Sequence, residues 1–164
     1  MQRRVLPAAF LALAVAGFGC ESATKDVTIF QATLAGSNEV PANGSAASGG
    51  CSVQIEGNTA IYSVAVNGIS NVTGSHIHIA AAGTNGPIRV VLLPTPGGAN
   101  FLSTPLSSVN GLLMSGDFGG GQVVAITFDQ LVSNLRAGTA YCNVHTTAFP
   151  GGEIRGQFQP VSLD

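Results

Sequence analysis

The sequence predicts an all-β protein, a Greek-key β-sandwich of seven to eight strands with one short helix. Composition is the first reason, because 22 glycines, 8 prolines, no tryptophan and 9% charged residues are typical of short strands joined by tight turns. Alternation is the second reason, because apolar side chains recur at every second position in several runs, as in a strand with one buried face. Turn residues separate these runs, which favours a sandwich.

The N-terminus is typical of a secretory signal peptide over residues 1–19. Arg3 and Arg4 precede an apolar run at 5–18, and small residues and Cys20 follow it. The run of about 14 residues is too short to span a bilayer comfortably and has the flanks of a signal sequence. The protein is therefore expected to be exported.

Cys20 is predicted to be lipidated and to become the first mature residue. Gly19-Cys20 resembles the end of a bacterial lipoprotein signal, although Gly17 stands where such signals usually carry leucine. Cleavage by an ordinary signal peptidase, which would release the chain, remains an alternative. Residues 20–27 are short and polar and would form a tether, so we expect a periplasmic or cell-surface protein that meets a membrane only through a lipid anchor.

Each expected strand follows from alternation or from a bounded apolar run. The segment 27–34 alternates, and the Gly- and Ser-rich segment 42–50 is interpreted as a loop. Gly57-Asn58 tolerates positive φ and predicts a hairpin. The near-continuous apolar run 88–93 predicts a strand that is buried on both faces. The expected strands are 27–34, 51–56, 59–66, 74–79, 88–93, 112–118, 140–145 and 153–159.

One helix is predicted at about 128–136, between the expected strands 112–118 and 140–145. Thr127 can accept a hydrogen bond from the backbone amide of Gln130, while the Gln130 side chain reaches back to Thr127, which is a capping box. Gly138 can end the helix in the left-handed conformation.

The three histidines of the chain are the candidate metal ligands. His76 and His78 point away from the core if Ile77 points into it, and His145 points away from the core if Cys142 points into it. Two distant strands therefore each present imidazole on an outer face. If these strands are close in space, the three side chains could hold one ion, and copper is the metal we consider.

The alternative interpretation is three half-exposed histidines on a β-surface that bind nothing. A metal site requires the imidazole nitrogens to converge to about 2 Å from a common point. Ring centres more than about 10 Å apart would therefore leave only this alternative.

The cysteines predict one disulfide. In an exported protein with three cysteines, acylation of Cys20 leaves Cys51 and Cys142 as a pair, and both are on the predicted inward faces of strands. Their bridge would close a loop of about 90 residues, with a stabilisation on the order of 4 kcal/mol. It also suits an oxidising compartment.

Charge and motifs exclude several function classes. From Cys20 onward there are four basic and eight acidic residues, a net charge of −4, with no basic run, so nucleic acid is not an expected partner. Asp117 and Asp129 do not form a recognisable acid/base pair, and no serine stands in a nucleophile elbow. Glu153 and Arg155 alternate outward on the last strand and are interpreted as a surface pair that fixes a turn.

Several spaced motifs occur in an order that resembles a known domain family. They are Phe30-Gln31-Ala32-Thr33-Leu34, Asn38-Glu39-Val40-Pro41, Ser75-His76-Ile77-His78, Leu135-Arg136-Ala137-Gly138-Thr139-Ala140-Tyr141, Asn143-Val144-His145-Thr146 and Pro150-Gly151-Gly152-Glu153-Ile154-Arg155-Gly156-Gln157. Over about residues 28–159 the chain is similar to the CHRD (chordin-type) domain. The resemblance implies an extracytoplasmic β-domain, which we place at 28–160. It is a weaker guide to any reaction that the protein would catalyse.

A weaker resemblance is to copper/zinc superoxide dismutase. His76, His78 and the pair Val144-His145 match the copper-ligand positions of that sandwich, and Arg155 after a Gly-rich turn loosely resembles its anion-guiding arginine. The chain has no fourth histidine to bridge copper to zinc, and Cys51 precedes the His-x-His strand. These departures argue against a dismutase and leave a three-histidine copper site open.

Two functions therefore follow from the sequence. The first is a non-enzymatic binding module of the cell envelope, whose partner would be an envelope protein or a polysaccharide. The second is a copper-binding protein with His76, His78 and His145 as ligands. A copper-dependent redox enzyme is a weaker form of the second.

Overall fold

A computed structural model describes residues 28–94 and 97–162. The predicted signal peptide, the lipidation site Cys20 and the whole of the predicted tether lie outside these residues. Within the described ranges, none of the helical segments combines the length and the apolar character that a membrane crossing requires.

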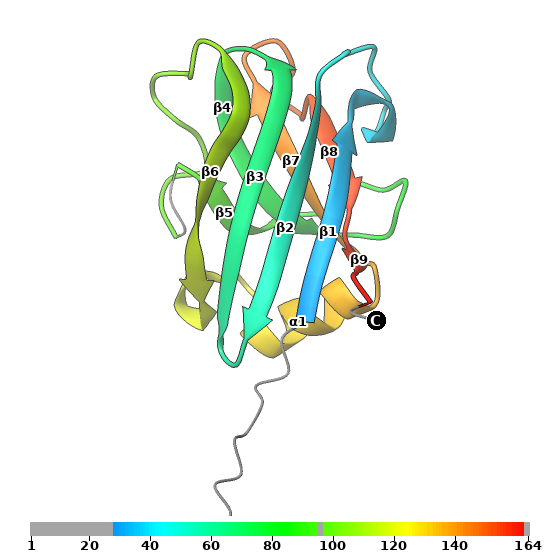
Figure 1. Cartoon of the computed structure of the whole chain (residues 1–164), viewed down its shortest axis with the longest axis vertical. Coiled ribbons are helices and arrows are strands. Elements are labelled where there is room, and N and C mark those ends of the chain that lie inside the picture. Colours follow the sequence, from blue (N-terminus) through cyan, green and yellow to red (C-terminus); the bar gives the residue numbers. More distant parts are fainter. Residues whose placement is uncertain (1–27, 95–96, 163–164) are drawn as a thin grey trace, which may run out of the picture.

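The fold is all-β with one short helix, which confirms the predicted class (Figure 1). All strands belong to one antiparallel sheet in the order β5-β4-β7-β8-β1-β2-β3-β6, with β9 paired to β1. The strands are β1 (Thr28–Ala35), β2 (Ser48–Glu56), β3 (Thr59–Ile69), β4 (Val72–Ile79), β5 (Ile88–Leu93), β6 (Val109–Gly119), β7 (Ala140–Thr146), β8 (Ile154–Gln157) and β9 (Gln159–Pro160).

The sheet folds over into two facing layers that nearly close into a barrel. Strands β6, β3, β2 and β1 form one layer, and β5, β4, β7 and β8 form the layer behind it (Figure 1). The layers join where Ala35 of β1 pairs with Arg155 of β8. The two inner faces form one apolar core, as the alternation predicts. Phe30, Leu34, Val64, Ile77 and Val144 are among its fully buried members.

Short sequence motifs predicted the β2–β3 hairpin turn and the helix at their observed positions. The β2–β3 hairpin turns at Gly57, whose φ is +59°, and Glu56 pairs with Thr59. Helix α1 spans Phe128–Arg136 as predicted, and its capping box is present, with the Gln130 amide donating to Thr127 Oγ1. The helix lies across the lower end of the two layers in Figure 1, where it closes the core with Leu131 and its apolar neighbours.

Two predicted loop segments are in fact strand. Ser48–Gly50 was assigned to a loop, yet it extends β2, because the backbone of these residues pairs with β1 on one side and with β3 on the other. The strand expected to end at residue 66 continues through Asn67 and Gly68 to Ile69, with a bulge at which Gly68 has φ +67°. Such small residues carry too little local signal to reveal pairing with distant strands.

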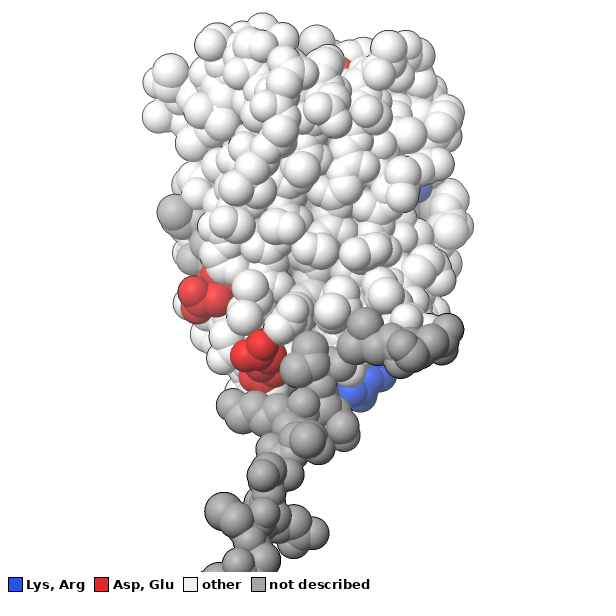
Figure 2. Space-filling model, viewed as in Figure 1, with Lys and Arg blue, Asp and Glu red and all other residues white. Residues whose placement is uncertain are grey.

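Charged side chains are sparse on the face of the β6-β3-β2-β1 layer (Figure 2). Two acidic groups and one basic group lie near its lower end, and only a little red near the top and a little blue at the right edge are visible besides them. The described residues in this view form no electropositive patch for a polyanion.

Candidate metal centre

The three predicted ligands come from two neighbouring strands of one layer. His76 and His78 lie on β4, and His145 lies on β7, where Gly74 pairs with His145 and His76 with Asn143. Ile77 between the two β4 histidines points into the core, so the imidazoles point to the opposite face. The face assignment from the sequence is therefore confirmed.

The interpretation of these histidines as half-exposed is wrong. His76, His78 and His145 are 0%, 7% and 5% exposed, because loops cover this face of the sheet. The ring of Phe101 stands edge-on to the rings of His76 and His145, at 5.2 Å in each case, and Tyr141 stacks on His78. Two aromatic rings thus border the site: buried Tyr141, and Phe101, which is 43% exposed.

The imidazoles converge. Ring centres are 4.8 Å apart for His76 and His145, 5.7 Å for His76 and His78, and 6.1 Å for His78 and His145. One ring nitrogen of each lies within 4.8 Å of the corresponding nitrogens of the others. Three nitrogens bound at about 2 Å from one ion are closer together than this, so binding would draw the rings inward.

Each imidazole is oriented by a backbone carbonyl from a different loop. His76 Nε2 bonds to Asn100 O at 2.6 Å, His78 Nδ1 to Gly86 O at 2.8 Å, and His145 Nδ1 to Pro150 O at 3.0 Å. A carbonyl oxygen can only accept, so these ring nitrogens carry the proton. The opposite nitrogen of each ring then presents a lone pair, which is how metal-binding histidines are held.

The three lone-pair nitrogens are orphaned. His76 Nδ1, His78 Nε2 and His145 Nε2 are buried and have no hydrogen-bond partner, and Asn143 Oδ1, on the same face of β7 as His145, has none either. A buried polar atom without a partner costs about 1–3 kcal/mol, and here three acceptors meet in one place. One cation would satisfy all three nitrogens.

The histidines are held neutral, the form that binds metal. Burial lowers the pKa of His76 to about 3, helped by the charge of His145, and it lowers the pKa of His145 to about 4 against the hydrogen bond to Pro150. Burial also lowers the pKa of His78, and the charge of Arg155 adds a smaller effect in the same direction. Protons therefore do not compete for the lone pairs near neutral pH.

The interpretation of Glu153 and Arg155 as a surface pair is wrong. Both are buried, and they do not pair with each other: Glu153 accepts hydrogen bonds from Ser45 Oγ at 2.7 Å and Thr146 Oγ1 at 2.6 Å. The loop that follows β1 folds over the end of β8 and supplies partners more than 100 positions away in sequence. The alternation of polar and apolar residues along one strand does not predict that a loop from elsewhere in the chain covers the strand.

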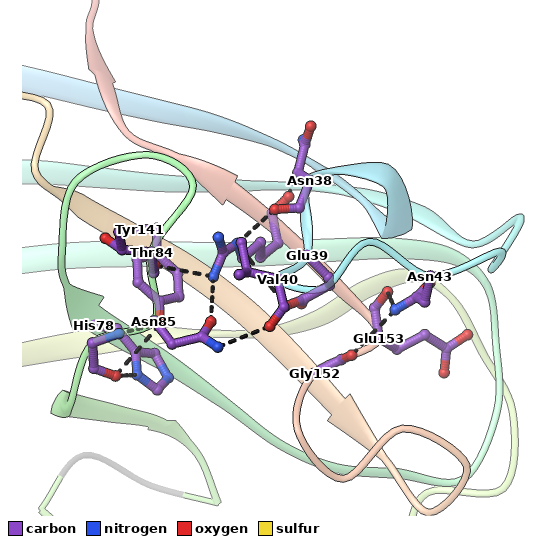
Figure 3. Close-up of polar contacts among 12 residues, drawn as sticks. Asn38, Glu39, Val40, Asn43, His78, Thr84, Asn85, Tyr141, Gly152 and Glu153 are labelled. Carbon is purple, nitrogen blue, oxygen red and sulfur yellow. Dashed lines mark hydrogen bonds and ion pairs between the residues drawn. The ribbon is translucent and has the colours of Figure 1, made fainter.

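Arg155 instead forms the centre of a polar network beside the histidines. Its partners Asn38, Thr84 and Asn85 are labelled in Figure 3. Its Nε donates to Asn38 O at 2.6 Å and its Nη1 to Asn85 Oδ1 at 2.9 Å. The guanidinium carbon lies 4.7 Å from the centre of the Tyr141 ring, and that ring stacks on His78 at 4.8 Å and 7°. The sequence predicts that Tyr141 and His145 share one face of their strand. It does not predict that Tyr141 stacks on His78.

Glu39 is the acidic partner of Arg155. Their closest charged atoms, Arg155 Nε and Glu39 Oε2, are 4.0 Å apart, and both side chains are buried. Burial raises the pKa of Glu39 to about 7, while Arg155 and the Val40 amide act in the opposite direction. This ion pair is thus a loose one.

The two core cysteines lie together in the interior. Cys51 of β2 and Cys142 of β7 are buried on facing layers of the same core. Burial raises the pKa of the Cys51 thiol well above its usual value, and the neighbouring Cys142 adds to this. The structure carries both as free thiols, so the disulfide remains a prediction.

Arg155 and Glu39 also line a polar cleft. Its volume is about 620 Å³, and its lining includes the side chains of Gln31, Asn38, Gln157 and Gln159. None of the three histidines lines it, so the cleft and the histidine cluster are separate features.

Comparisons with known proteins identify the family of this chain. A family model described as the CHRD domain matches residues 30–158, a span that contains the three histidines, the buried cysteines and Arg155. Searches of curated proteins and of solved structures found no match. Because the match covers most of the sequence, the chain belongs to the CHRD domain family.

Proposed function

We propose that this CHRD domain binds one copper ion through His76, His78 and His145. The observation that carries the proposal is the convergence of three buried lone-pair nitrogens, each fixed by a backbone carbonyl and none with a partner. A set of unrelated surface histidines would gain nothing from three such orientations.

The donor set favours copper among the common metal ions. The cluster found among the described residues consists of three imidazoles, without carboxylate or thiolate. Imidazole suits copper, zinc, iron and nickel, and a site of fixed geometry binds divalent copper most tightly among these. A carboxylate-poor site is unsuited to calcium or magnesium.

The burial of the three-histidine site favours retention of an ion and disfavours the rapid turnover of a substrate. The three rings are at most 7% exposed, and Phe101 covers two of them edge-on. We therefore favour storage or delivery of copper over a copper-dependent enzyme. The signal-like N-terminus and Cys20 support a setting in the cell envelope, at the periplasmic or outer surface.

A second candidate function is the binding of an envelope protein or polysaccharide. The cleft of about 620 Å³ favours it, because amide and hydroxyl side chains line it and could bind a ligand rich in hydroxyl or amide groups. This function would not involve the histidines.

Calorimetric titration of the purified protein with copper and with zinc tests the proposal. The native protein should bind one copper ion with submicromolar affinity, and His78→Ala and His145→Ala should each weaken binding by at least about 100-fold. Gln31→Ala, which alters the polar cleft, is the matched control and should bind as the native protein does. Absence of binding, or binding indifferent to both histidine substitutions, would retire the copper proposal.

A further inference from the structure

The histidine cluster is connected to a buried positive charge through one aromatic ring. Tyr141 stacks on His78 with ring centres 4.8 Å apart, and the guanidinium carbon of Arg155 lies 4.7 Å from the centre of the same ring. Arg155 is only 4% exposed, so water screens its charge poorly. A cation at the histidines would therefore feel this charge.

The charge of Arg155 is only partly neutralised. Its hydrogen-bond partners are the neutral oxygens of Asn38, Thr84 and Asn85. The carboxylate that forms an ion pair with it within the described ranges is Glu39, at 4.0 Å, which is longer than a hydrogen bond. One oxygen of that carboxyl, Oε1, has no partner. The charge of Arg155 therefore reaches the histidines, where it opposes a positive charge on His78.

The charge is also fixed in position. Asn38 lies in the loop after β1, and Thr84 and Asn85 lie in the loop between β4 and β5, so the guanidinium joins two loops that are distant in sequence (Figure 3). The loop between β4 and β5 also carries Gly86, whose carbonyl orients His78. The arrangement cannot relax when the charge of a bound ion changes, which is the condition for a preorganised electrostatic effect.

We propose that Arg155, acting through Tyr141, is a positioning residue that biases the three-histidine site toward copper(I) over copper(II). The inference rests on the proposed copper function. A fixed positive charge opposes a doubly charged ion more than a singly charged one. At the distances set by one intervening ring, and with an effective dielectric constant of about 20, the ratio of the two affinities should change on the order of tenfold.

Competition titrations with chelators of copper(I) and of copper(II), together with the reduction potential of the copper-loaded protein, test this inference. Arg155→Met should lower the ratio of copper(I) to copper(II) affinity about tenfold, which corresponds to a fall of about 59 mV in potential for a one-electron couple. Arg155→Lys keeps the charge and should stay within about threefold of the native ratio.

Glu39→Gln supplies a change of the opposite sign. It removes the negative partner while preserving side-chain size, so the ratio and the potential should rise. Arg155→Met also removes the hydrogen bonds that join two loops. Its effect is therefore interpreted together with that of Glu39→Gln, which changes the buried surroundings less.

The outcomes separate this inference from the copper proposal itself. A native protein that binds no copper would contradict the proposed function. A native protein that binds copper, with Arg155→Met and Glu39→Gln shifting the potential in opposite directions, would support the role of Arg155. Equal potentials in all variants, or shifts of the same sign in both, would overturn it.

Discussion

At the scale of single residues, the orientation of the histidines matters more than their number. Each ring donates to a backbone carbonyl and directs its other nitrogen to a common point. The sequence predicted which residues share the face, since alternation along β4 and β7 fixes that. It did not predict the burial, because Asn100, Phe101 and Pro150 come from loops whose position depends on the whole fold.

The neutral histidines should make the metal-free protein sensitive to acid. His76 and His145 have pKa values of about 3 and about 4 in the fold, against about 6.5 in the unfolded chain. As the pH falls below about 6.5, the unfolded chain therefore takes up protons that the fold excludes, and stability falls. His78 acts in the same direction.

Glu39 acts in the opposite direction over part of this range. Its pKa is about 7 in the fold and 4.5 otherwise, so it contributes stability that increases as the pH falls from about 7 to 4.5. Three histidines outweigh one carboxyl, and urea unfolding should show a net loss of at least about 1 kcal/mol between pH 7 and pH 5. Constant or rising stability over that interval would show that the histidines accept protons in the fold.

At the scale of elements, boundaries were predicted best where one short motif decides them. The capping box of Thr127 and Gln130 placed α1 at its observed bounds, and Gly57 placed the β2–β3 hairpin. The start of β2 was missed, because Ser48–Gly50 is strand only through its pairing with β1 and β3. The loops around Arg155 were missed for the same reason: their partners are far away in sequence.

The capping box should contribute measurably to stability. Thr127 Oγ1 accepts from the Gln130 amide at 3.2 Å, so Thr127→Ala should lower the free energy of unfolding by about 1 kcal/mol. Thr127→Ser keeps the acceptor and is the matched control, with an expected change of a few tenths of a kcal/mol. Equal urea midpoints for Thr127→Ala and the native protein would mean that α1 is held by its packed face alone.

At the scale of the whole molecule, the two layers are joined by the pairing of β1 with β8 and β9 and by the shared core. A bond between Cys51 and Cys142 would add a covalent link across the core. The Cys142 thiol is near enough to help raise the pKa of Cys51, and the loop between the two residues has about 90 residues, so oxidation should stabilise the fold by on the order of 4 kcal/mol.

Refolding the protein with oxidised glutathione tests this link. One cysteine attacks the disulfide of glutathione and releases one glutathione thiol, and the other cysteine then attacks the resulting mixed disulfide and releases the second as the protein disulfide forms. Peptide mass spectrometry should find Cys51 joined to Cys142, and the urea midpoint should exceed that of the reduced protein and of Cys142→Ala treated alike. If both cysteines remain open to alkylation after this treatment, the predicted disulfide is wrong.

The central claim is that three imidazoles hold one ion. X-ray absorption spectroscopy of the copper-loaded protein tests it most directly, because multiple scattering identifies imidazole ligands. We predict three imidazole nitrogens at about 2 Å from copper in the native protein and two in His145→Ala. A spectrum with fewer than three imidazoles in the native protein, or one that His145→Ala leaves unchanged, would contradict the claim.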